Sequence, residues 1–141
     1  MSQRLGQHFL TNTSKLRRIC DALTLTEGDV VVEIGSGHAE LTRHIFQHPV
    51  TVIAVERDSR LAALLARNFQ FSIFNFQTMT NFQFSDPPRL LIEGDALKVL
   101  PRLAEMLQEA GVSYKLVGNI PYYITGRLLR VIGELQHMPT C

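Results

Sequence analysis

The sequence predicts an α/β fold in which an open, mostly parallel sheet is covered by helices on both faces, as in doubly wound proteins. Two observations carry this prediction. Short runs rich in β-branched and other apolar residues alternate along the chain with segments whose apolar residues recur at helical spacing. The first of these runs also passes through a glycine-rich turn directly into a helical segment, as strands of this fold class do.

Each predicted element follows from its own residues. The strands are short, apolar and rich in valine, isoleucine and leucine, which suits strands buried on both faces. They cover residues 30–34, 50–55, 89–93 and 116–118. Helices alternate with them over residues 13–24, from Gly37 to about residue 47, and over 59–67, 101–111 and 125–135.

Helix ends are predicted from capping residues. Pro101 fits the first position of a helix, and Gly111 fits the position after its last residue. Thr125 is a suitable cap for the last helix. The apolar face of that helix is predicted from the spacing of Leu128, Leu129, Ile132 and Leu135.

Residues 68–88 interrupt the alternation. No charge occurs between Arg67 and Asp86, and the tripeptide Asn-Phe-Gln appears at 68–70, 75–77 and 81–83. The phenylalanines also allow a pair of strands or a surface for a partner. We favour a locally repeated, low-complexity insertion before the third strand, without a catalytic role.

Composition indicates one globular domain over residues 1–141. The apolar fraction of 45% and the charged fraction of 19% are typical of soluble proteins. No apolar run approaches the roughly 20 residues of a membrane helix, and the amino terminus has no signal-peptide core, so we expect a cytoplasmic protein. The cysteines and histidines show no metal-ligand spacing, so no metal site is predicted.

The net charge of +1 argues against a strongly basic nucleic-acid binder. The basic residues are unevenly distributed, however, because no acid precedes Asp21. The segment before it carries Arg4, Lys15, Arg17 and Arg18. This arm is suited to contact phosphates, and it fits a solvated helix face equally well.

The turn Gly35-Ser36-Gly37 follows the first predicted strand. Glycine permits a tight turn and lets a ligand approach backbone N–H groups, so Gly35 and Gly37 are candidate cofactor-binding residues. Many turns between a strand and a helix contain glycines only because the backbone geometry requires them, without binding a ligand. Glu56 strengthens the functional interpretation, since an acid at the end of the second strand can accept hydrogen bonds from the ribose of an adenosine-containing cofactor.

The turn favours S-adenosylmethionine over a dinucleotide. A dinucleotide site normally has a third glycine where this chain has Glu40, which would repel a pyrophosphate. S-adenosylmethionine has no phosphate, and its ammonium and sulfonium groups are positive. Glu33 is a candidate for the ammonium end, directly or through water, and it also fits an ordinary strand carboxylate.

A third acid, Asp95, follows the third predicted strand and is a candidate acceptor for the adenine amino group. Glu33, Glu56 and Asp95 therefore stand close to the ends of three strands. Because the carboxyl ends of parallel strands meet at one edge, where such folds bind ligands, we expect the three acids in one site.

Asn119-Ile120-Pro121-Tyr122 follows the fourth predicted strand and suits recognition of the exocyclic amine of a flat base. The Asn119 side chain and the Ile120 carbonyl can accept both N–H bonds of an adenine amine and favour the pyramidal nitrogen needed for attack. Tyr122 can stack on an extruded base. Asn119, Ile120, Pro121 and Tyr122 are therefore the predicted catalytic residues. In the alternative interpretation, these residues form only a strand end and the tyrosines lie in the core. This alternative fits the sequence less well.

In their order along the chain these residues resemble one family, the ribosomal RNA adenine dimethyltransferases. It includes the bacterial small-subunit (KsgA-type) enzymes and the erythromycin-resistance methylases. The matching segments are 6–10, 32–42, 55–58, 93–96 and 119–123, which correspond to the amino-terminal cofactor motif, glycine loop, ribose motif, adenine motif and target-base motif. Ser36 departs from the proline usual in small-subunit enzymes, and Ala39 stands where many members have glycine.

The resemblance implies a Rossmann-like S-adenosylmethionine-dependent methyltransferase fold. It implies that the cofactor is contacted by His8, Leu10, Gly35, Glu56, Asp95 and Asn119. It also implies N6,N6-dimethylation of adenine in small-subunit ribosomal RNA. A non-catalytic cofactor-binding fragment and a large-subunit methylase of the resistance type remain alternatives.

Members of the family are longer than this chain and carry further strands and a small helical domain that helps to hold RNA. We therefore expect residues 1–141 to form an incomplete methyltransferase domain, truncated after the fourth strand and its helix. The fourth strand would then lie at an open edge of the sheet. An open edge with apolar surface predicts marginal stability or self-association of this chain.

Overall fold

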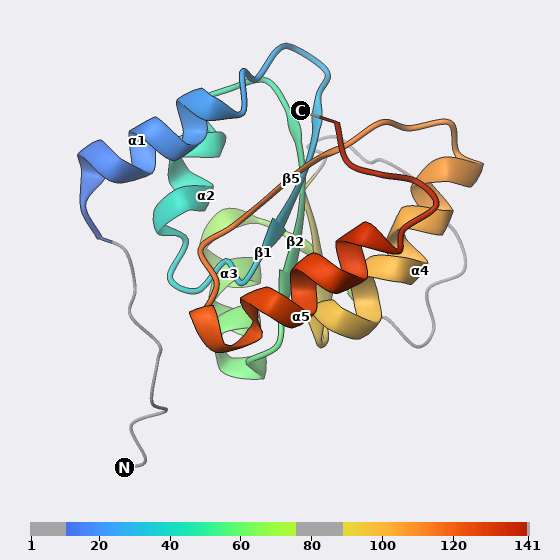
Figure 1. The fold of residues 1–141 in the computed structure, drawn as a ribbon. Coiled ribbons are helices and arrows are strands. Elements are labelled where there is room, and N and C mark those ends of the chain that lie inside the picture. The colour runs from blue at the N-terminus through green and yellow to red at the C-terminus, as the bar shows by residue number, and fades with distance from the viewer. Residues whose placement is uncertain (1–10, 76–88, 141) are drawn as a thin grey trace.

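A computed structural model describes residues 11–75 and 89–140, and Figure 1 shows their arrangement. In chain order the elements are α1 (Thr13–Ala22), β1 (Val30–Ile34), α2 (Glu40–Ile45), β2 (Thr51–Glu56), α3 (Ser59–Phe69), β3 (Ser72–Asn75), β4 (Arg89–Glu93), α4 (Ala96–Glu109), β5 (Lys115–Gly118) and α5 (Tyr122–Gly133). The amino-terminal motif with His8 and Leu10, the repeats after Asn75, and Cys141 lie outside the described residues.

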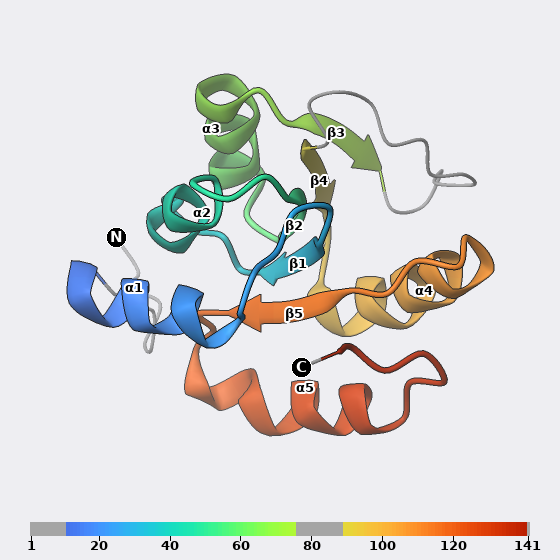
Figure 2. The same cartoon turned by 90° about the horizontal axis from the view of Figure 1, so that it is seen from above.

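The described strands form a parallel sheet in the order β3-β4-β2-β1-β5, which Figure 2 shows from above. β1 lies between β2 and β5, with Ile34 opposite both Val55 and Gly118. The carboxyl ends of these three strands therefore meet at one edge of the sheet. The predicted open parallel sheet is confirmed.

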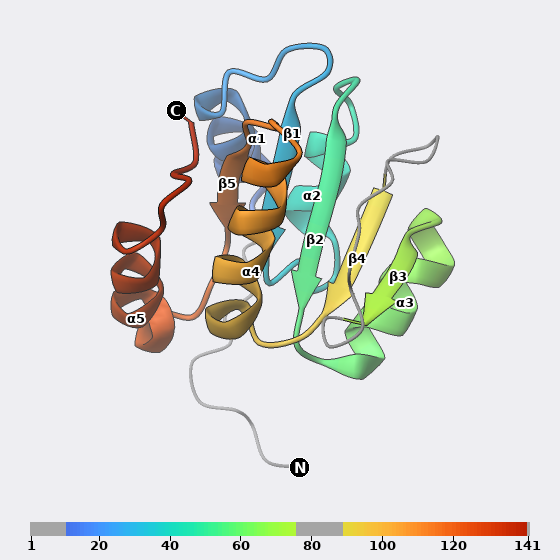
Figure 3. The same cartoon turned by 90° about the vertical axis from the view of Figure 1, so that its right-hand side faces the viewer.

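Helices cover both faces of the sheet, as Figures 1 and 3 show. Successive residues of a strand point to opposite faces. Val30, Val32 and Ile34 pack in a core with α4 and α5, whereas Val31 packs in a second core with α1, α2 and α3. The doubly wound arrangement follows from this two-sided burial. None of the helices in the described part is long and apolar enough to span a bilayer.

The sheet contains a strand at a place where an insertion was favoured and a pair of strands was the alternative. α3 extends to Phe69, and β3 then pairs in parallel with β4. Phe71 is buried in the core with α3, and Phe74 packs on the opposite side. The first part of the proposed insertion is therefore the end of α3 followed by a regular edge strand, with Phe71 and Phe74 packed on opposite sides of the sheet.

The start of α4 also differs from the prediction. Pro101 lies inside this helix, and Asp95 precedes its first turn. The Asp95 side chain accepts a hydrogen bond from Leu97 N at 3.0 Å, which caps the helix. The cap and the apolar face around Leu100 and Leu103 outweigh the preference of proline for a first position. At the other end, Gly111 has a φ of +69° and closes α4 as predicted.

The last helix begins earlier than predicted, at Tyr122 instead of near Thr125. The Thr125 hydroxyl lies within the first turn, where it donates a hydrogen bond to Pro121 O at 3.3 Å. Leu129 was predicted on the apolar face and is 62% exposed. The face toward the core is formed by Leu128, Val131, Ile132 and Leu135. Helical spacing alone does not tell which side of a helix the sheet covers.

β5 lies at the sheet edge, as predicted, and two contacts fix it beside β1. At its amino end, the Lys115 ammonium lies 2.8 Å from the Asp29 carboxylate, which lowers the pKa of Asp29. At its carboxyl end, a Cβ on Gly118 would lie 2.7 Å from Ile34 O. Only glycine allows this close approach without a shift of one strand.

The close approach at Gly118 predicts that Gly118→Ala lowers the free energy of unfolding by about 1–3 kcal/mol, because a backbone atom must move to admit the methyl group. Urea unfolding measures this change. Gly126→Ala is the matched control, since nothing lies within 4 Å of its Cβ position in α5. Alanine there is expected to leave the stability unchanged or raise it by up to about 1 kcal/mol. Equal effects of the two substitutions would contradict the packing argument.

Candidate functional site

The structure brings the glycine turn and the predicted target-base motif together at the carboxyl edge of the sheet. Gly35 has a φ of +69° and Gly37 a φ of +54°, so both occupy the left-handed region that favours glycine. A Cβ on Gly35 would lie 3.7 Å from Ile120 Cγ2 and 4.0 Å from Asn119 O. The two loops therefore lie next to each other, as the pairing of β1 with β5 requires.

Glu56 ties this turn to the end of β2. Its side chain is buried, and Oε2 accepts a hydrogen bond from Gly37 N at 3.0 Å. Oε1 accepts a second one from Asp58 N at 2.9 Å. The carboxylate thus orients the glycine turn. Each carboxylate oxygen can accept more than one hydrogen bond, so Glu56 retains capacity for a ligand.

Asp95 lies at the neighbouring strand end. Gly94 N donates to Glu56 O at 3.0 Å, which joins the ends of β4 and β2. The Oδ1 atom of Asp95 caps α4 through Leu97 N. Asp95 lies at the carboxyl edge, as the sequence predicted. Its role as the cap of α4 was not predicted.

Glu33 is the most deeply buried acid of the site, with 1% of its surface exposed. It points to the side of the sheet covered by α2, where Thr42 Oγ1 donates a hydrogen bond to its Oε2 atom at 2.7 Å. Thr42 was not predicted to have a role. The only sequence signal for this contact is a polar residue on the inner side of the helix after the glycine turn.

Burial raises the pKa of Glu33 to about 7. The nearby carboxylates of Glu56 and Glu40 act in the same direction. The hydroxyls of Thr42 and Ser36 lower the pKa, although Ser36 does so without a hydrogen bond of normal geometry. At neutral pH this side chain is therefore poised between its neutral and charged forms.

A small pocket opens beside these groups and unites three parts of the chain. It is lined by Glu33, Gly35, Ser36, Gly37, Glu40, Leu41 and Asn119. Four of these residues were predicted site residues. Acidic and uncharged polar groups line the pocket, and none of the lining residues is basic. The pocket is therefore suited to a cation.

The target-base motif turns outward from this pocket. Asn119 is exposed, and Ile120 and Pro121 are half-buried. Tyr122 and Tyr123 are 79% and 58% exposed, so their rings are available to a planar partner. Tyr122 begins α5, and its ring is not part of the core, contrary to the alternative in which the tyrosines are core residues.

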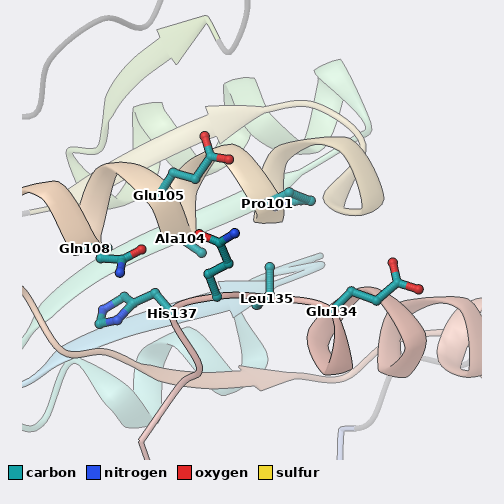
Figure 4. A pocket seen from close by; sticks show the side chains of 8 residues that line it. Pro101, Ala104, Glu105, Gln108, Glu134, Leu135 and His137 are labelled. Carbon is teal, nitrogen blue, oxygen red and sulfur yellow. The ribbon is translucent and has the colours of Figure 1, made fainter.

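A larger cavity of about 150 Å³ lies between α4 and the end of α5, and Figure 4 shows its lining side chains. It is lined by Pro101, Ala104, Glu105, Gln108, Glu134, Leu135, Gln136 and His137. None of the predicted site residues belongs to it. Over residues 11–75 and 89–140, no group of three or more His, Cys, Asp or Glu side chains is placed to hold a metal ion.

Comparisons with known proteins agree with this arrangement. Residues 1–140 match the model of the family described as ribosomal RNA adenine dimethylase. The chain is 37% identical over 135 residues to the ribosomal RNA small subunit methyltransferase A of Dehalococcoides mccartyi, covering 96% of this chain and 40% of that protein. It is 40% identical over 137 residues to the protein of the same name from Synechococcus sp., covering 95% and 43%.

Two solved structures share the fold. One is a dimethyladenosine transferase from Plasmodium falciparum, with a TM-score of 0.67 and 24% identity over 95% of this chain and 41% of that one. The other is the 23S rRNA methyltransferase ErmE, with a TM-score of 0.66 and 22% identity over 93% and 45%. The chain spans about 40% of the length of the curated relatives in these comparisons. The family match over residues 1–140 shows that this chain belongs to the ribosomal RNA adenine dimethylases.

Proposed function

We propose that this chain contributes the cofactor and target-base sites of a cytoplasmic enzyme that transfers methyl groups from S-adenosylmethionine to N6 of adenine in small-subunit ribosomal RNA. One observation carries the proposal: the glycine turn and Asn119 lie side by side and line the same pocket. A cofactor bound at the turn and a base held by Asn119 would then be neighbours. Such proximity is the main requirement for methyl transfer.

The cofactor site consists of residues with complementary roles. The absence of side chains at Gly35 and Gly37 lets the ligand approach the turn, whose glycine N–H groups are held by Val55 O and Glu56 Oε2. Glu56 accepts hydrogen bonds from the ribose, and Asp95 accepts one from the adenine amino group. The amino-acid end faces Glu33, whose negative form complements its ammonium group. In the family pattern His8, Leu10 and Asn119 complete the cofactor contacts. The acidic pocket supports this assignment, because it would disfavour a phosphate-bearing ligand.

The chain's own groups prepare the acceptor nitrogen. The Asn119 side-chain oxygen and the Ile120 carbonyl accept the two N–H bonds of the adenine amine, and Pro121 restricts the backbone between these acceptors and α5. Tyr122, which is 79% exposed, stacks on the extruded base. The acceptors stabilise positive charge as it develops on nitrogen during attack on the methyl carbon. Bound S-adenosylmethionine would supply the electrophilic methyl group: the N6–CH3 bond would form as the S–CH3 bond breaks, S-adenosylhomocysteine would leave, and the N6 proton would pass to solvent.

Two other functions differ in what they require. A non-catalytic fragment would bind the cofactor without turnover. A large-subunit methylase would use the same chemistry on another RNA, and the fold shared with ErmE is the observation in its favour. The similarity to curated small-subunit enzymes, at 37–40% identity, favours the small subunit.

We also propose that the chain associates with a second copy of itself through the open β5 edge and the outer side of α5, which lies next to β5 in Figure 2. Leu129 and Tyr123 are exposed on α5. Apolar surface beside an unpaired strand edge favours pairing between copies.

Methyl transfer tests the catalytic assignment. Labelled S-adenosylmethionine is incubated with the chain and with small or large ribosomal subunits in parallel. Asn119→Ala is expected to lower incorporation about 100-fold or more, because one transition-state acceptor is lost. Asn68→Ala, an exposed asparagine on α3, is the control and keeps full activity. Incorporation that does not change in Asn119→Ala contradicts the mechanism, and binding of the cofactor without incorporation supports the non-catalytic alternative.

Because Glu33 is buried, removal of its negative charge by substitution is expected to raise the free energy of unfolding by an amount that depends on pH. Its folded-state pKa is about 7 and its ordinary value 4.5, so the folded protein holds the extra proton between these values. The contribution of Glu33 to stability is present at low pH and is lost as the pH rises through 7. Glu33→Gln keeps an acceptor for Thr42 and removes the charge. It is expected to raise the free energy of unfolding by about 1–3 kcal/mol at pH 8 and to leave it unchanged at pH 4.

Urea unfolding at the two pH values measures this effect. Glu27→Gln, in the exposed turn before β1, is the matched control and is expected to behave like the unsubstituted chain. If Glu33→Gln is less stable than the unsubstituted chain at pH 8, the charged form of Glu33 is favourable in the fold and the argument from burial is wrong.

Sedimentation over a range of concentrations tests self-association. The chain is expected to form dimers that dissociate on dilution, and Leu129→Lys is expected to weaken them about tenfold or more by placing a charge in the interface. Leu64→Lys changes another exposed leucine, on α3, and should leave the dimer intact. A chain that remains monomeric at every concentration, or equal effects of both lysines, would refute the interface.

A further inference from the structure

An open concavity lies at the amino edge of the sheet, opposite the glycine turn, and has no part in the proposed reaction. Thr51 and Arg89, which line it, are the first residues of β2 and β4. Figure 3 shows the amino ends of these strands close together. Phe46 and His48, from the end of α2 and the loop after it, form another part of the lining. The volume of the concavity is about 440 Å³, which is within the range of small-molecule sites.

The guanidinium group of Arg89 is held in a fixed orientation. Its central carbon lies 3.9 Å from the centroid of the Phe46 ring, and Nη1 donates a hydrogen bond to Phe69 O at 2.9 Å. Stacking uses the face of the group, so the N–H donors in its plane stay available, apart from the one that binds Phe69. Because the side chain is half-buried and oriented, a ligand would not have to order it.

These contacts leave the positive charge of Arg89 uncompensated. A phenyl ring and a carbonyl carry no net charge, and within residues 11–75 and 89–140 Arg89 forms no ion pair with an acid. Arg43, whose guanidinium carbon lies 5.5 Å from the centroid of the Phe69 ring, adds a second positive charge to this aromatic cluster. Glu27 is the one acid among the lining residues, and its side chain is exposed, where salt screens its charge. The concavity is therefore suited to an anion.

The other donors of the concavity favour a phosphate group over a carboxylate. His48 and Thr51 line it together with Arg89, and each side chain can donate one hydrogen bond. A guanidinium fork binds two oxygens of an anion, so the imidazole and the hydroxyl match further oxygens. A phosphate ester has them, whereas a carboxylate has only two oxygens. The remaining volume leaves room for a sugar attached to the phosphate.

We propose that this concavity is a second binding site, which takes the phosphate group of a nucleotide through Arg89, His48 and Thr51. The phosphate belongs either to a free nucleotide or to the backbone of an RNA, since both present the same oxygens. The site does not rest on the proposed methyl transfer. It lies where the strands begin, and the glycine turn follows the end of β1, so a nucleotide here leaves the cofactor pocket open.

Uridine ligands test this site, because uracil has no exocyclic amine for the proposed target-base site to recognise. Titration calorimetry at a fixed salt concentration compares uridine 5′-monophosphate, uridine and a uridine hexanucleotide. Uridine is expected to bind about tenfold more weakly than its monophosphate or worse, because it lacks the charged acceptor. Arg89→Gln is expected to weaken binding of the monophosphate about tenfold, since it removes charged hydrogen bonds.

Two further variants separate a phosphate contact from other effects. Arg43→Gln removes an equal charge that stacks on Phe69 and does not line the concavity, so it should change the affinity about twofold at most. Arg89→Gln also loses contacts with Phe46 and Phe69 and should lower the urea midpoint. His48→Ala loses none of these contacts and should leave the midpoint unchanged while it weakens binding of the monophosphate about threefold.

The hexanucleotide identifies the source of the phosphate. If Arg89→Gln weakens its binding as well, the site takes an RNA backbone, and if only binding of the monophosphate is weakened, the site takes a free nucleotide. Three results would overturn the site. They are equal affinities for uridine and its monophosphate, unchanged binding in both Arg89→Gln and His48→Ala, and a loss in Arg43→Gln as large as that in Arg89→Gln.

Discussion

The arrangement of the site depends on one close contact between neighbouring strands. At Gly118 the backbone of β5 passes so near the Ile34 carbonyl that a Cβ would lie 2.7 Å from it. A side chain at this position would push β5 outward and move Asn119, which follows directly, away from Gly35. Strand pairing sets which residues are opposite, with Gly118 beside Ile34. The missing side chain sets how close the two loops come.

The acids near the carboxyl edge hold parts of the protein in place, and of Glu33, Glu56 and Asp95 it is Glu33 that lines the pocket beside the glycine turn. Glu56 binds the backbone of the glycine turn, and Asp95 caps α4. Glu33 is joined to α2 through Thr42. Their carboxylates are therefore oriented by donors of the fold, and ligand binding does not have to order them. This preorganisation has a cost at Glu33, because burial disfavours its charged form.

Much of this fold is predictable from local pattern, and the errors occur where tertiary packing decides. The run Val30–Ile34 is a strand with the predicted bounds, because a short apolar run of β-branched residues favours a strand buried on both faces. Leu129 was wrongly placed in the core because helical spacing fits more than one face. In the site, Gly35 and Asn119 were predicted from their places at strand ends. The contact of Thr42 with Glu33 depends on how α2 packs against β1, which no spacing rule contains. The roles of His8 and Leu10 stay predictions.

The target-base motif has two sides with different surroundings. On one side, Asn119 lines the acidic pocket beside the glycine turn. On the other, Tyr122 begins α5 and is 79% exposed. Pro121 separates them with a φ of −58°, a backbone angle that its ring restricts. A base stacked on Tyr122 therefore approaches from solvent. A cofactor at the glycine turn lies in the pocket at the carboxyl edge of the sheet. In the proposed function the cofactor and the base are both held next to Asn119, and this proximity favours direct displacement at the methyl carbon.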